Sequence, residues 1–389
     1  MSSEHKKKIV LLTLVHPDFL PPVYACAQTL RDLNYDVHVL TFDSYVPADV
    51  EIGNNIKIEA LGQHHNVPFF KRLKLRRKFA ARAKEIVKDH TTAIISFCPF
   101  SFISGLKFKP QIPVVYFALE IADFNINSLL RSPLSNINNF IAMHRMQEAD
   151  LVATPSVQRS AWLAGRCHLK ILPETIFNTS YSSGAQNPLS DEIFKNIIPQ
   201  HFQGKKIILY TGAANERLCV FELVKAFEML NDQKCALIVT GMRDNKYCNE
   251  IKSFVNGARN KTNILLLPYV TREEMLSLQA NADIGACLGR EYNEVIASKM
   301  IAPNKVGEYL NKGLFILGTK CEYMNMFELR GVAALAVSPE PEAVCLSLKT
   351  ALNVVYAGNY KQTISSFVQE YFCMQKQAAP IVNFLSNIK

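Results

Sequence analysis

Apolar runs rich in β-branched residues alternate with helical segments along this chain, and this alternation limits the fold more than any other feature. Residues 8–14 form a continuous apolar run, a helix is expected to end near Leu33, and 36–42 is the next run. A strand that is apolar throughout is covered on both faces, as in a parallel sheet. Strand, helix and strand at this spacing form a βαβ unit. The sequence therefore predicts an α/β protein built on parallel sheets.

The alternation occurs in two series, separated by a stretch with little periodicity. The first series continues with expected strands at 93–97, 113–117 and 151–154, and residues 177–203 are rich in Asn, Ser and Pro. A second series starts at Lys205, and 389 residues are enough for two domains of ordinary size. We predict a first domain at 1–176, a linker at 177–204, a second domain at 205–356 and a C-terminal helix at 357–389.

The composition limits the class of protein. With 49% hydrophobic and 20% charged residues, the chain is typical of globular proteins, and no apolar run reaches the ~18–20 residues of a membrane-spanning helix. The first residues read as a strand and not as a signal peptide. The ten cysteines form no CxxC pair, which favours reduced thiols over disulfides or a zinc site. We therefore expect a cytoplasmic protein.

Positive charge is concentrated in one predicted helix at 69–90. The net charge of +9 is compatible with an anionic partner, but no helix-turn-helix, zinc-finger or RRM signature indicates nucleic acid. One interpretation is that the helix binds an anionic membrane surface or a lipid-phosphate acceptor, with Phe69 and Phe70 entering the bilayer. The other is a surface helix with a solvated basic face, and the two are about equally supported. The basic residues are Lys71, Arg72, Lys74, Arg76, Arg77, Lys78, Arg82 and Lys84.

Residues 298–319 read as the start of a helix, its end and a following strand. Pro303 suits the first helical turn. Asn304 and Lys305 then lie in that turn, where free backbone N–H groups and the positive end of the helix dipole favour an anion such as phosphate. Glu308, just over one turn further on, is placed to accept hydrogen bonds from a sugar diol. The alternative is a surface helix with a solvated glutamate.

Glycine and basic residues follow several strands of the second series. In a parallel sheet, ligands bind at the carboxyl ends of the strands. Three arginines and a lysine that converge there with a helix N-terminus are what a diphosphate requires. Each of these residues alone is more often an ordinary loop residue, and only the set favours a site. The set is Gly212 with Glu216 and Arg217, Gly241 with Arg243, Tyr269 with Val270, Gly289 with Arg290, and Asn304 with Lys305.

The histidines do not predict a metal site. His64 and His65 are adjacent, but no nearby carboxylate completes a ligand set, and a turn before the basic helix is the simpler interpretation. His16 follows the first strand and is expected to face a cleft between the domains, for capping or for substrate contact. The sequence contains no Walker A, GxSxG or HExxH motif, and its first loop lacks GxGxxG.

Several stretches of the second series resemble one family of enzymes. APNKVGEYLNKGLFILGT resembles the donor-site helix of GT-B glycosyltransferases, especially retaining family 4 members with Pro-Asn-Lys ahead of the glutamate. KIILYTGAANERLCVFELVKAF is similar to the opening strand, loop and helix of their donor domain. ALIVTG, NILLLPYVTREEMLSLQANADIGACL and ADLVATPS also fit. The resemblance covers nearly the whole chain and is specific over 205–319.

The resemblance implies a fold and a set of roles. The fold is GT-B, with two Rossmann-like domains whose parallel sheets face each other across a cleft and a C-terminal helix that crosses back. Glu308 would bind the ribose of a nucleotide sugar, and Arg217 with Lys305 would grip the diphosphate and stabilise the departing charge. Donor binding would also involve Asn304, Pro303, Gly212, Tyr269, Val270 and Arg243, and His16 and Glu120 would lie on the acceptor side.

The sequence departs from the family pattern at three positions. The paired glutamates of the family are eight residues apart, but Met300 stands eight residues before the motif glutamate, and Glu294 is among the nearest polar candidates for its role. Ala213 replaces the basic residue that follows the glycine. Leu119, beside Glu120, stands where a histidine is often found. These departures leave the stereochemistry of transfer, and activity itself, open.

The sequence as a whole favours a glycosyltransferase that uses a nucleotide-diphosphate sugar, without a metal ion or another cofactor. The expected acceptor is a glycan or a lipid-linked molecule in surface polysaccharide or glycoconjugate synthesis. We expect the sugar to be transferred with retention of configuration. We also expect the protein to act in the cytoplasm, in contact with the inner face of the membrane. One alternative is a non-catalytic GT-B protein that binds a nucleotide sugar or a partner. Another is a nucleotide-sugar epimerase, which would need converging acid/base carboxylates and histidines.

Overall fold

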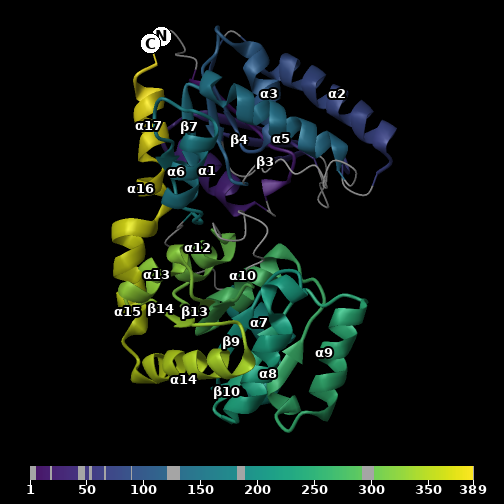
Figure 1. Cartoon of the computed structure of the whole chain (residues 1–389), viewed down its shortest axis with the longest axis vertical. Coiled ribbons are helices and arrows are strands. Elements are labelled where there is room, and N and C mark those ends of the chain that lie inside the picture. The colour runs from purple at the N-terminus through teal and green to yellow at the C-terminus, as the bar shows by residue number, and fades with distance from the viewer. Residues whose placement is uncertain are drawn as a thin grey trace. The chain divides into compact units, whose positions relative to one another are not determined.

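The chain forms two compact units, each with its own parallel sheet (Figure 1). The computed structural model describes residues 6–17, 20–42, 49–51, 55–64, 67–88, 90–120, 132–181, 189–290 and 302–388. Unit 1 comprises Met1–Tyr181 and Met374–Lys389, and unit 2 comprises Ser182–Cys373. Because the last residues of the chain belong to unit 1, the chain leaves this unit once and returns to it.

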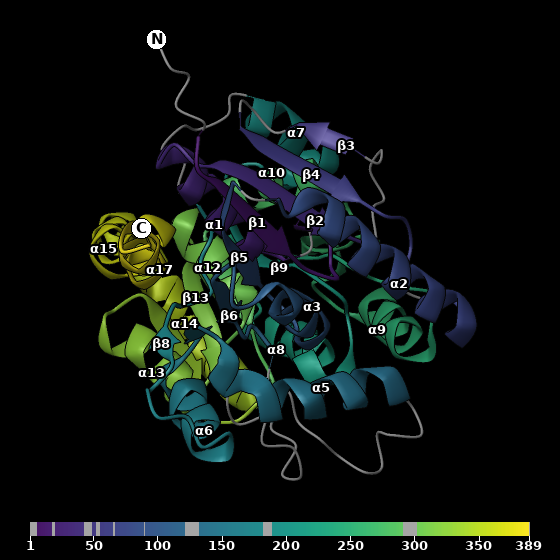
Figure 2. The ribbon, with the colours of Figure 1, turned by 90° about the horizontal axis from the view of Figure 1, so that it is seen from above.

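Unit 1 contains an eight-stranded sheet of order β3-β4-β2-β1-β5-β6-β7-β8 (Figure 2). All neighbouring strands are parallel except β3 and β4, which pair antiparallel at the edge. Apart from Lys8 at its start, β1 is apolar and buried, as is β6, which is expected for a sheet that is covered on both faces. The strands are β1 (Lys8–Leu12), β2 (Asp36–Thr41), β3 (Asp49–Glu51), β4 (Ile56–Ala60), β5 (Thr91–Ser96), β6 (Val114–Phe117), β7 (Leu151–Thr154) and β8 (Glu174–Thr175).

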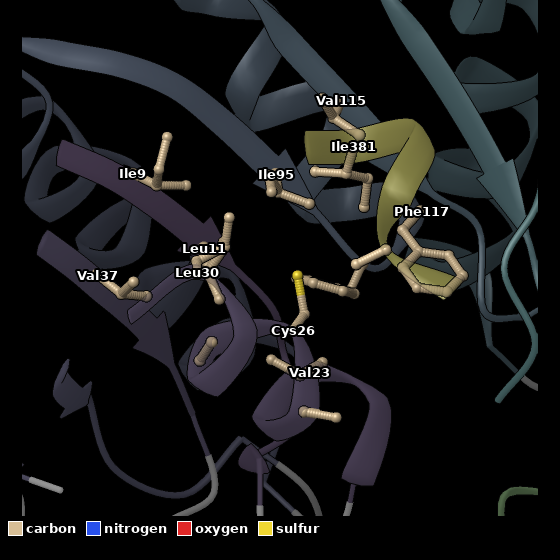
Figure 3. Close-up of a cluster of buried hydrophobic side chains, with 14 of the residues drawn as sticks. Ile9, Leu11, Val23, Cys26, Leu30, Val37, Ile95, Val115, Phe117 and Ile381 are labelled. Atoms are coloured by element: carbon tan, nitrogen blue, oxygen red, sulfur yellow. The ribbon is translucent and has the colours of Figure 1, made fainter. Parts of the chain in front are cut away.

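The two faces of this sheet have separate hydrophobic clusters, because side chains alternate along each strand. Ile9 and Leu11 of β1 belong to one cluster, together with residues of α1 and α17 (Figure 3). Val10 and Leu12 belong to the other, together with residues of α2, α3 and α5. The helices of unit 1 are α1 (Pro21–Asp32), α2 (Phe69–Ile86), α3 (Pro99–Gly105), α5 (Pro133–Arg145), α6 (Val157–Arg166), α16 (Met374–Gln377) and α17 (Ala379–Ser386).

The C-terminal segment is a chain of short helices where the sequence predicts one helix over 357–389. Helix α15 (Tyr360–Phe367) continues into a π-helical turn (Val368–Phe372) and is followed by α16 and α17. The break occurs at Cys373, whose backbone is extended, and a proline then occupies the first turn of α17. Ile381 and Leu385 of α17 are fully buried in the cluster of unit 1. Figure 3 shows Ile381 among the side chains of this cluster.

Unit 2 contains a six-stranded sheet of order β11-β10-β9-β12-β13-β14, parallel throughout. This is the order of a doubly wound nucleotide-binding sheet. The strands are β9 (Lys206–Tyr210), β10 (Cys235–Val239), β11 (Ile264–Leu266), β12 (Ile284–Cys287), β13 (Phe315–Thr319) and β14 (Ala333–Ala336). The helices are α7 (Leu189–Ile197), α8 (Val220–Leu230), α9 (Lys246–Gly257), α10 (Arg272–Ala280), α12 (Asn304–Asn311), α13 (Glu322–Leu329), α14 (Pro341–Ala357) and α15.

Some elements of unit 2 follow the sequence prediction and others do not. Helix α10 begins directly after Thr271, which forms the predicted capping box with Glu274. Helix α7 lies within 177–204, the range expected to be a linker, and belongs to unit 2. Strand β14 was not expected because its sequence, AALA, has no β-branched residue, yet its four residues are buried and pair with β13.

In each sheet, an aspartate that precedes one strand binds the backbone of the neighbouring strand. In unit 1, Asp150 precedes β7 and accepts a hydrogen bond from the backbone N–H of Val114 at 2.7 Å. In unit 2, Asp283 precedes β12 and accepts one from the N–H of Ile207 at 2.9 Å. In both units the second carboxylate oxygen accepts from a lysine Nζ, at 2.8 Å and 3.0 Å. Both units therefore contain an aspartate that accepts hydrogen bonds from a backbone N–H of the neighbouring strand and from a lysine.

Candidate functional site

Two glycine turns meet at the carboxyl ends of β9 and β10. Gly212 follows β9 with φ +108°, and Gly241 follows β10 with φ +78°. The N–H of Ala214 donates to the carbonyl of Gly241 at 3.2 Å. A Cβ on Gly241 would lie 2.0 Å from the carbonyl oxygen of Gly212. Only glycine fits at Gly241, because both its backbone angle and the close approach of the neighbouring turn exclude a side chain.

Helix α12 begins beside these turns. Pro303 is its N-cap residue and not part of the first turn as the sequence predicts, so the helix starts at Asn304. Proline supplies no capping side chain, and the first N–H groups of a helix have no partner within the helix. Lys305 Nζ lies 3.9 Å from the centre of the Tyr210 ring, and a Cβ on Gly212 would lie 3.3 Å from it. An ammonium group therefore lies over the turn after β9.

Burial changes the electrostatics of this ammonium group. It lowers the pKa of Lys305 to about 8, and the nearby Cys287 and Glu308 oppose the shift without cancelling it. The charged form of a lysine in such a place lacks the hydration it would have in water. An anion beside it would restore the lost stabilisation, so the position suits a phosphate group.

The predicted diol-binding residue is buried and already has an ionic partner. Glu308 is 6% exposed, which contradicts the alternative of a surface helix with a solvated glutamate. Its Oε1 lies 2.5 Å from Nη1 of Arg272, the first residue of α10. Gln279 Nε2 donates to Oε2 over a longer distance of 3.5 Å. Sequence reasoning did not identify Arg272, because no local spacing relates it to α12.

A buried tyrosine fixes α12 against the first turn. The backbone N–H of Thr211 donates to the hydroxyl oxygen of Tyr309 at 2.9 Å, and the two hydroxyl groups lie 3.0 Å apart. A Cβ on Gly285 of β12 would lie 2.3 Å from the Tyr309 ring, so the ring packs directly on the strand. Tyr309 therefore sets the position of α12 on the sheet, and Lys305 and Glu308 lie on this helix.

The predicted arginines differ in their surroundings. Arg217 is exposed, and among the described residues no ion pair holds its guanidinium. Arg290 is engaged with two acids, Glu222 Oε1 at 2.8 Å and Glu340 Oε1 at 3.7 Å. Its backbone N–H donates to the carbonyl of Arg217 at 3.0 Å, which brings the two loops together. Arg217 is thus the arginine available to a ligand, whereas Arg290 is a structural residue.

A third cation lies on the loop after β10 and contacts the loop after β11. Arg243 stacks on the ring of Tyr269 with its guanidinium carbon 4.9 Å from the ring centre, and it donates to the tyrosine hydroxyl. The N–H of Gly241 donates to the carbonyl of Pro268 at 3.0 Å, so the loops after β10 and β11 are also joined. Val270 is half-buried next to this exposed tyrosine. The predicted donor residues of unit 2 therefore lie on connected loops at one end of the sheet.

The remaining predicted residues lie in unit 1 or outside the described residues. His16 is buried after β1, and Glu120 is exposed after β6. The carbonyl of Leu119 accepts from the Arg159 guanidinium. Glu294 lies outside the described residues. No group of three His, Cys, Asp or Glu residues that could hold a metal ion occurs in the part of the chain that the structure describes.

His64, the first histidine of the pair before the basic helix, has a structural role. His64 is buried, stacks on Phe42 with ring centres 5.0 Å apart, and accepts from Arg76 Nε at 3.3 Å. His65 lies outside the described residues. The imidazole of His64 therefore packs in the core of unit 1.

Helix α2 presents one charged face to solvent. Its buried side includes Phe79 and Ala83, and also Arg76, which packs over the ring of Phe100 at 4.9 Å. Arg82 is held by acids, at 2.5 Å from both Glu59 and Glu85. The exposed cations of the helix are Lys71, Lys74, Arg77, Lys78 and Lys84. Among the described helices none is long and apolar enough to cross a membrane.

The chain is similar over nearly its whole length to solved structures. Sucrose-phosphate synthase from Thermosynechococcus elongatus matches with a TM-score of 0.70 and 15% identity over 98% of both chains. HepE from Anabaena, solved in complex with UDP and glucose, matches with a TM-score of 0.68 and 15% identity over 98% of this chain and 100% of that chain. A glycosyltransferase from Rickettsia africae matches with a TM-score of 0.68 and 12% identity over 98% of both chains.

These likenesses establish the fold. The chain has the GT-B fold of two Rossmann-like α/β units, and the fold class predicted from the sequence is confirmed. No protein-family model matches the sequence, and a comparison with curated proteins gives no match.

Proposed function

We propose that this chain is a glycosyltransferase that transfers a sugar from a nucleoside-diphosphate sugar to a glycan or lipid-linked acceptor, with retention. The observation that carries the proposal is the position of Lys305, at the start of α12 and over the turn at Gly212, with Glu308 about one turn deeper. This arrangement offers a cation and free backbone N–H groups to a diphosphate and a carboxylate to a ribose. The similarity to HepE, solved with UDP and glucose, supports this choice of ligand.

The proposed chemistry depends on stabilising the leaving group. As the bond between sugar and diphosphate breaks, the sugar becomes oxocarbenium-like and negative charge grows on the diphosphate. Lys305 and the first N–H groups of α12 stabilise that charge, and Arg217 adds a second cation from the loop after β9. These groups supply the positive charge that a metal ion provides in other transferases. We therefore expect the reaction to proceed without a metal ion.

One departure from the family pattern is offset by this geometry. The resemblance places a basic residue directly after Gly212, where this chain has Ala213. The Lys305 ammonium group reaches the same turn from a different element. This favours an active enzyme over a non-catalytic binding protein.

The other donor and acceptor residues complete the proposal. Asn304 would bind the diphosphate through the first turn of α12, and Tyr269 with Val270 would border the base. In unit 1, His16 and Glu120 follow strands at the carboxyl end of the sheet and are the proposed acceptor residues.

The direct test incubates the chain with UDP-glucose, ADP-glucose or GDP-mannose without an acceptor. The release of the nucleoside diphosphate measures hydrolysis of the donor. We expect slow hydrolysis of one donor, and a loss of about 100-fold in rate in Lys305→Met, the cost of removing one charge-stabilising group. Lys234→Met is the matched control, because Lys234 is exposed next to the amino end of β10. Donor binding without release of nucleotide would support the non-catalytic alternative, and conversion to another nucleotide sugar would support the epimerase.

We also propose that the exposed cations of α2 bind an anionic membrane surface. The charged face carries five cations that no described acid pairs with, and Phe70 at its start is 81% exposed. Each lysine or arginine near an anionic surface contributes about 1 kcal/mol, and an exposed aromatic ring adds apolar contact. A face of this kind fits a bilayer that presents a lipid-linked acceptor.

Vesicle co-sedimentation tests this part of the proposal. With vesicles rich in phosphatidylglycerol, we expect the triple variant Lys74→Ala, Arg77→Ala, Lys78→Ala to bind at least about tenfold more weakly than the unchanged chain. Arg76 is left in place because it is buried. Neutralising three exposed lysines of unit 2, at Lys246, Lys252 and Lys261, is the control. Equal binding by the α2 variant and the unchanged chain would make α2 an ordinary surface helix.

A further inference from the structure

We propose that Arg272 is a positioning residue that holds the Glu308 carboxylate for the ribose diol of the donor; this inference rests on the proposed function. Glu308 is buried within α12, and a buried carboxylate is costly unless a cation or several donors compensate it. Arg272 is the cation within ion-pair distance, with 2.5 Å between Nη1 and Oε1. Without it, the carboxylate would keep only a 3.5 Å contact with Gln279 among the described residues.

The pair leaves hydrogen-bonding capacity for a ligand. Neither Nη1 of Arg272 nor Oε1 of Glu308 has a hydrogen-bond partner among the described residues, although both atoms are buried, so their contact is ionic and poorly aligned. Oε2 has only the long bond from Gln279. A vicinal diol can donate from both hydroxyl groups to a carboxylate, and such charge-assisted bonds are about twice as strong as neutral ones. Oε2 therefore has acceptor capacity left for a ribose hydroxyl, while Oε1 faces Arg272.

The backbone of Arg272 is itself held in place. The N–H of Glu274 donates to Thr271 Oγ1 at 3.2 Å, and the N–H of Thr271 donates to Glu274 Oε2 at 2.7 Å. This capping box fixes the first turn of α10, where Arg272 is the first residue. Tyr269 and Val270, the proposed neighbours of the base, lie just before it. Arg272 therefore joins the loop that would border the base to the carboxylate that would bind the ribose.

The experiment compares UDP with 2′,3′-dideoxy-UDP, which lacks the diol, by calorimetric titration of the full chain. We expect Arg272→Met to lower the affinity for UDP about tenfold and the affinity for the dideoxy nucleotide less than about twofold. The same substitution in a Glu308→Gln background should have little further effect, because Arg272 acts through Glu308. Arg272→Lys should restore part of the diol preference, and Glu273→Ala, at the next residue of α10, should leave it unchanged.

Three outcomes would overturn the inference. Equal loss for both nucleotides in Arg272→Met would mean that Arg272 supports the fold of α10 and not the ribose contact. Tighter binding of UDP would mean that Arg272 competes with the ribose for Glu308. Unchanged binding would mean that Glu308 needs no partner. If the unchanged chain binds none of UDP, ADP and GDP, the proposed function fails as well, so the two failures are distinguishable; circular dichroism confirms that each variant is folded.

Discussion

The sheets of the two units have the same order over six strands, but the loops that follow these strands differ. Strands β4, β2, β1, β5, β6 and β7 of unit 1 follow the same order as the six strands of unit 2. Asp150 and Asp283 join neighbouring strands by the same kinds of hydrogen bond, at different positions of the two sheets. After the first strand the units diverge. Unit 2 has the turn at Gly212, the turn at Gly241 that approaches it, and Lys305 above.

The first loop of unit 1 has no glycine turn and forms hydrogen bonds between Thr13 and Val15. Residues 13–17 contain no glycine. The hydroxyl of Thr13 donates to the carbonyl of Val15 at 3.1 Å and accepts from its N–H at 3.3 Å, and His16 is buried. The N–H groups of Thr13 and Val15 therefore already have partners and offer little to a phosphate. Two sheets with the same strand order therefore carry different loops, and the proposed function assigns the nucleotide to the unit that has the glycine turns and the cation of α12.

The largest effect is expected where the glycine turns of unit 2 touch. Gly241→Ala forces a Cβ against the Gly212 carbonyl, and we expect it to lower the free energy of unfolding by about 3–4 kcal/mol, from overpacking together with a strained φ. Gly313→Ala is the matched control, because Gly313 has φ +77° and a Cβ there meets no atom within 4 Å. It should cost only about 1 kcal/mol. Urea unfolding measures both, and equal costs would refute the steric argument.

A smaller contrast is expected between the two aspartates. Asp283 accepts from the N–H of Ile207, from Lys206 and from the Tyr360 hydroxyl at 2.8 Å, and its side chain is less exposed than that of Asp150. Asp283→Ala should therefore cost about 3 kcal/mol and Asp150→Ala about 1–2 kcal/mol of unfolding free energy. Chemical denaturation of each variant checks this order. A larger loss of unfolding free energy in Asp150→Ala would mean that the number of hydrogen-bond donors does not determine how much each aspartate stabilises its sheet.

Two buried tyrosines give a third contrast. The Tyr309 hydroxyl accepts from Thr211 N, whereas the Tyr116 hydroxyl has no hydrogen-bond partner among the described residues. Tyr309→Phe should cost about 1–2 kcal/mol, and Tyr116→Phe should be neutral or stabilising by up to about 1 kcal/mol. Thermal unfolding of the two variants measures the difference. Destabilisation by Tyr116→Phe would show that its hydroxyl is satisfied after all.

The pH dependence should also differ between the units. Burial, followed by the charge of Lys8, lowers the pKa of His38 in unit 1 to about 4, against an ordinary value of 6.5. The unfolded chain then binds more protons than the folded chain between about pH 4 and 6.5, so His38 reduces the stability of unit 1 as the pH falls through this range. The lowered pKa of Lys305 acts at the alkaline end, where it makes unit 2 more stable as the pH rises from about 8 towards 10.5.

This alkaline titration has a functional consequence. The affinity for a nucleoside diphosphate should fall as the pH rises through about 8, by up to about tenfold, because Lys305 loses the charge that attracts the phosphates. Titration calorimetry between pH 6.5 and 9.5 measures this fall. Lys305→Met should bind more weakly and show a flat profile over the same range. A falling profile that persists in the variant would assign the titration to another group.

The sequence predicts most strands and helix ends well, because short segments of the chain determine them. The central strands of both sheets are continuous apolar runs, and the capping box of α10 lies within four residues. Strand β14 escapes the same reasoning, because alanine has no strand preference and only its pairing with β13 makes AALA a strand. The site is harder still. Lys305 over Gly212 and Arg272 beside Glu308 join residues of different elements, and no spacing along the chain encodes these contacts.

The most direct test of the difference between the units is hydrogen–deuterium exchange with and without a saturating nucleotide sugar. The proposed function predicts slower exchange in residues 211–217 and 303–309 of unit 2, where the amides of the glycine turn and of the first turn of α12 would bind the diphosphate. Exchange in residues 13–17 of unit 1 should not change on nucleotide addition alone. Protection confined to the first loop of unit 1, with none in the two segments of unit 2, would contradict the central claim.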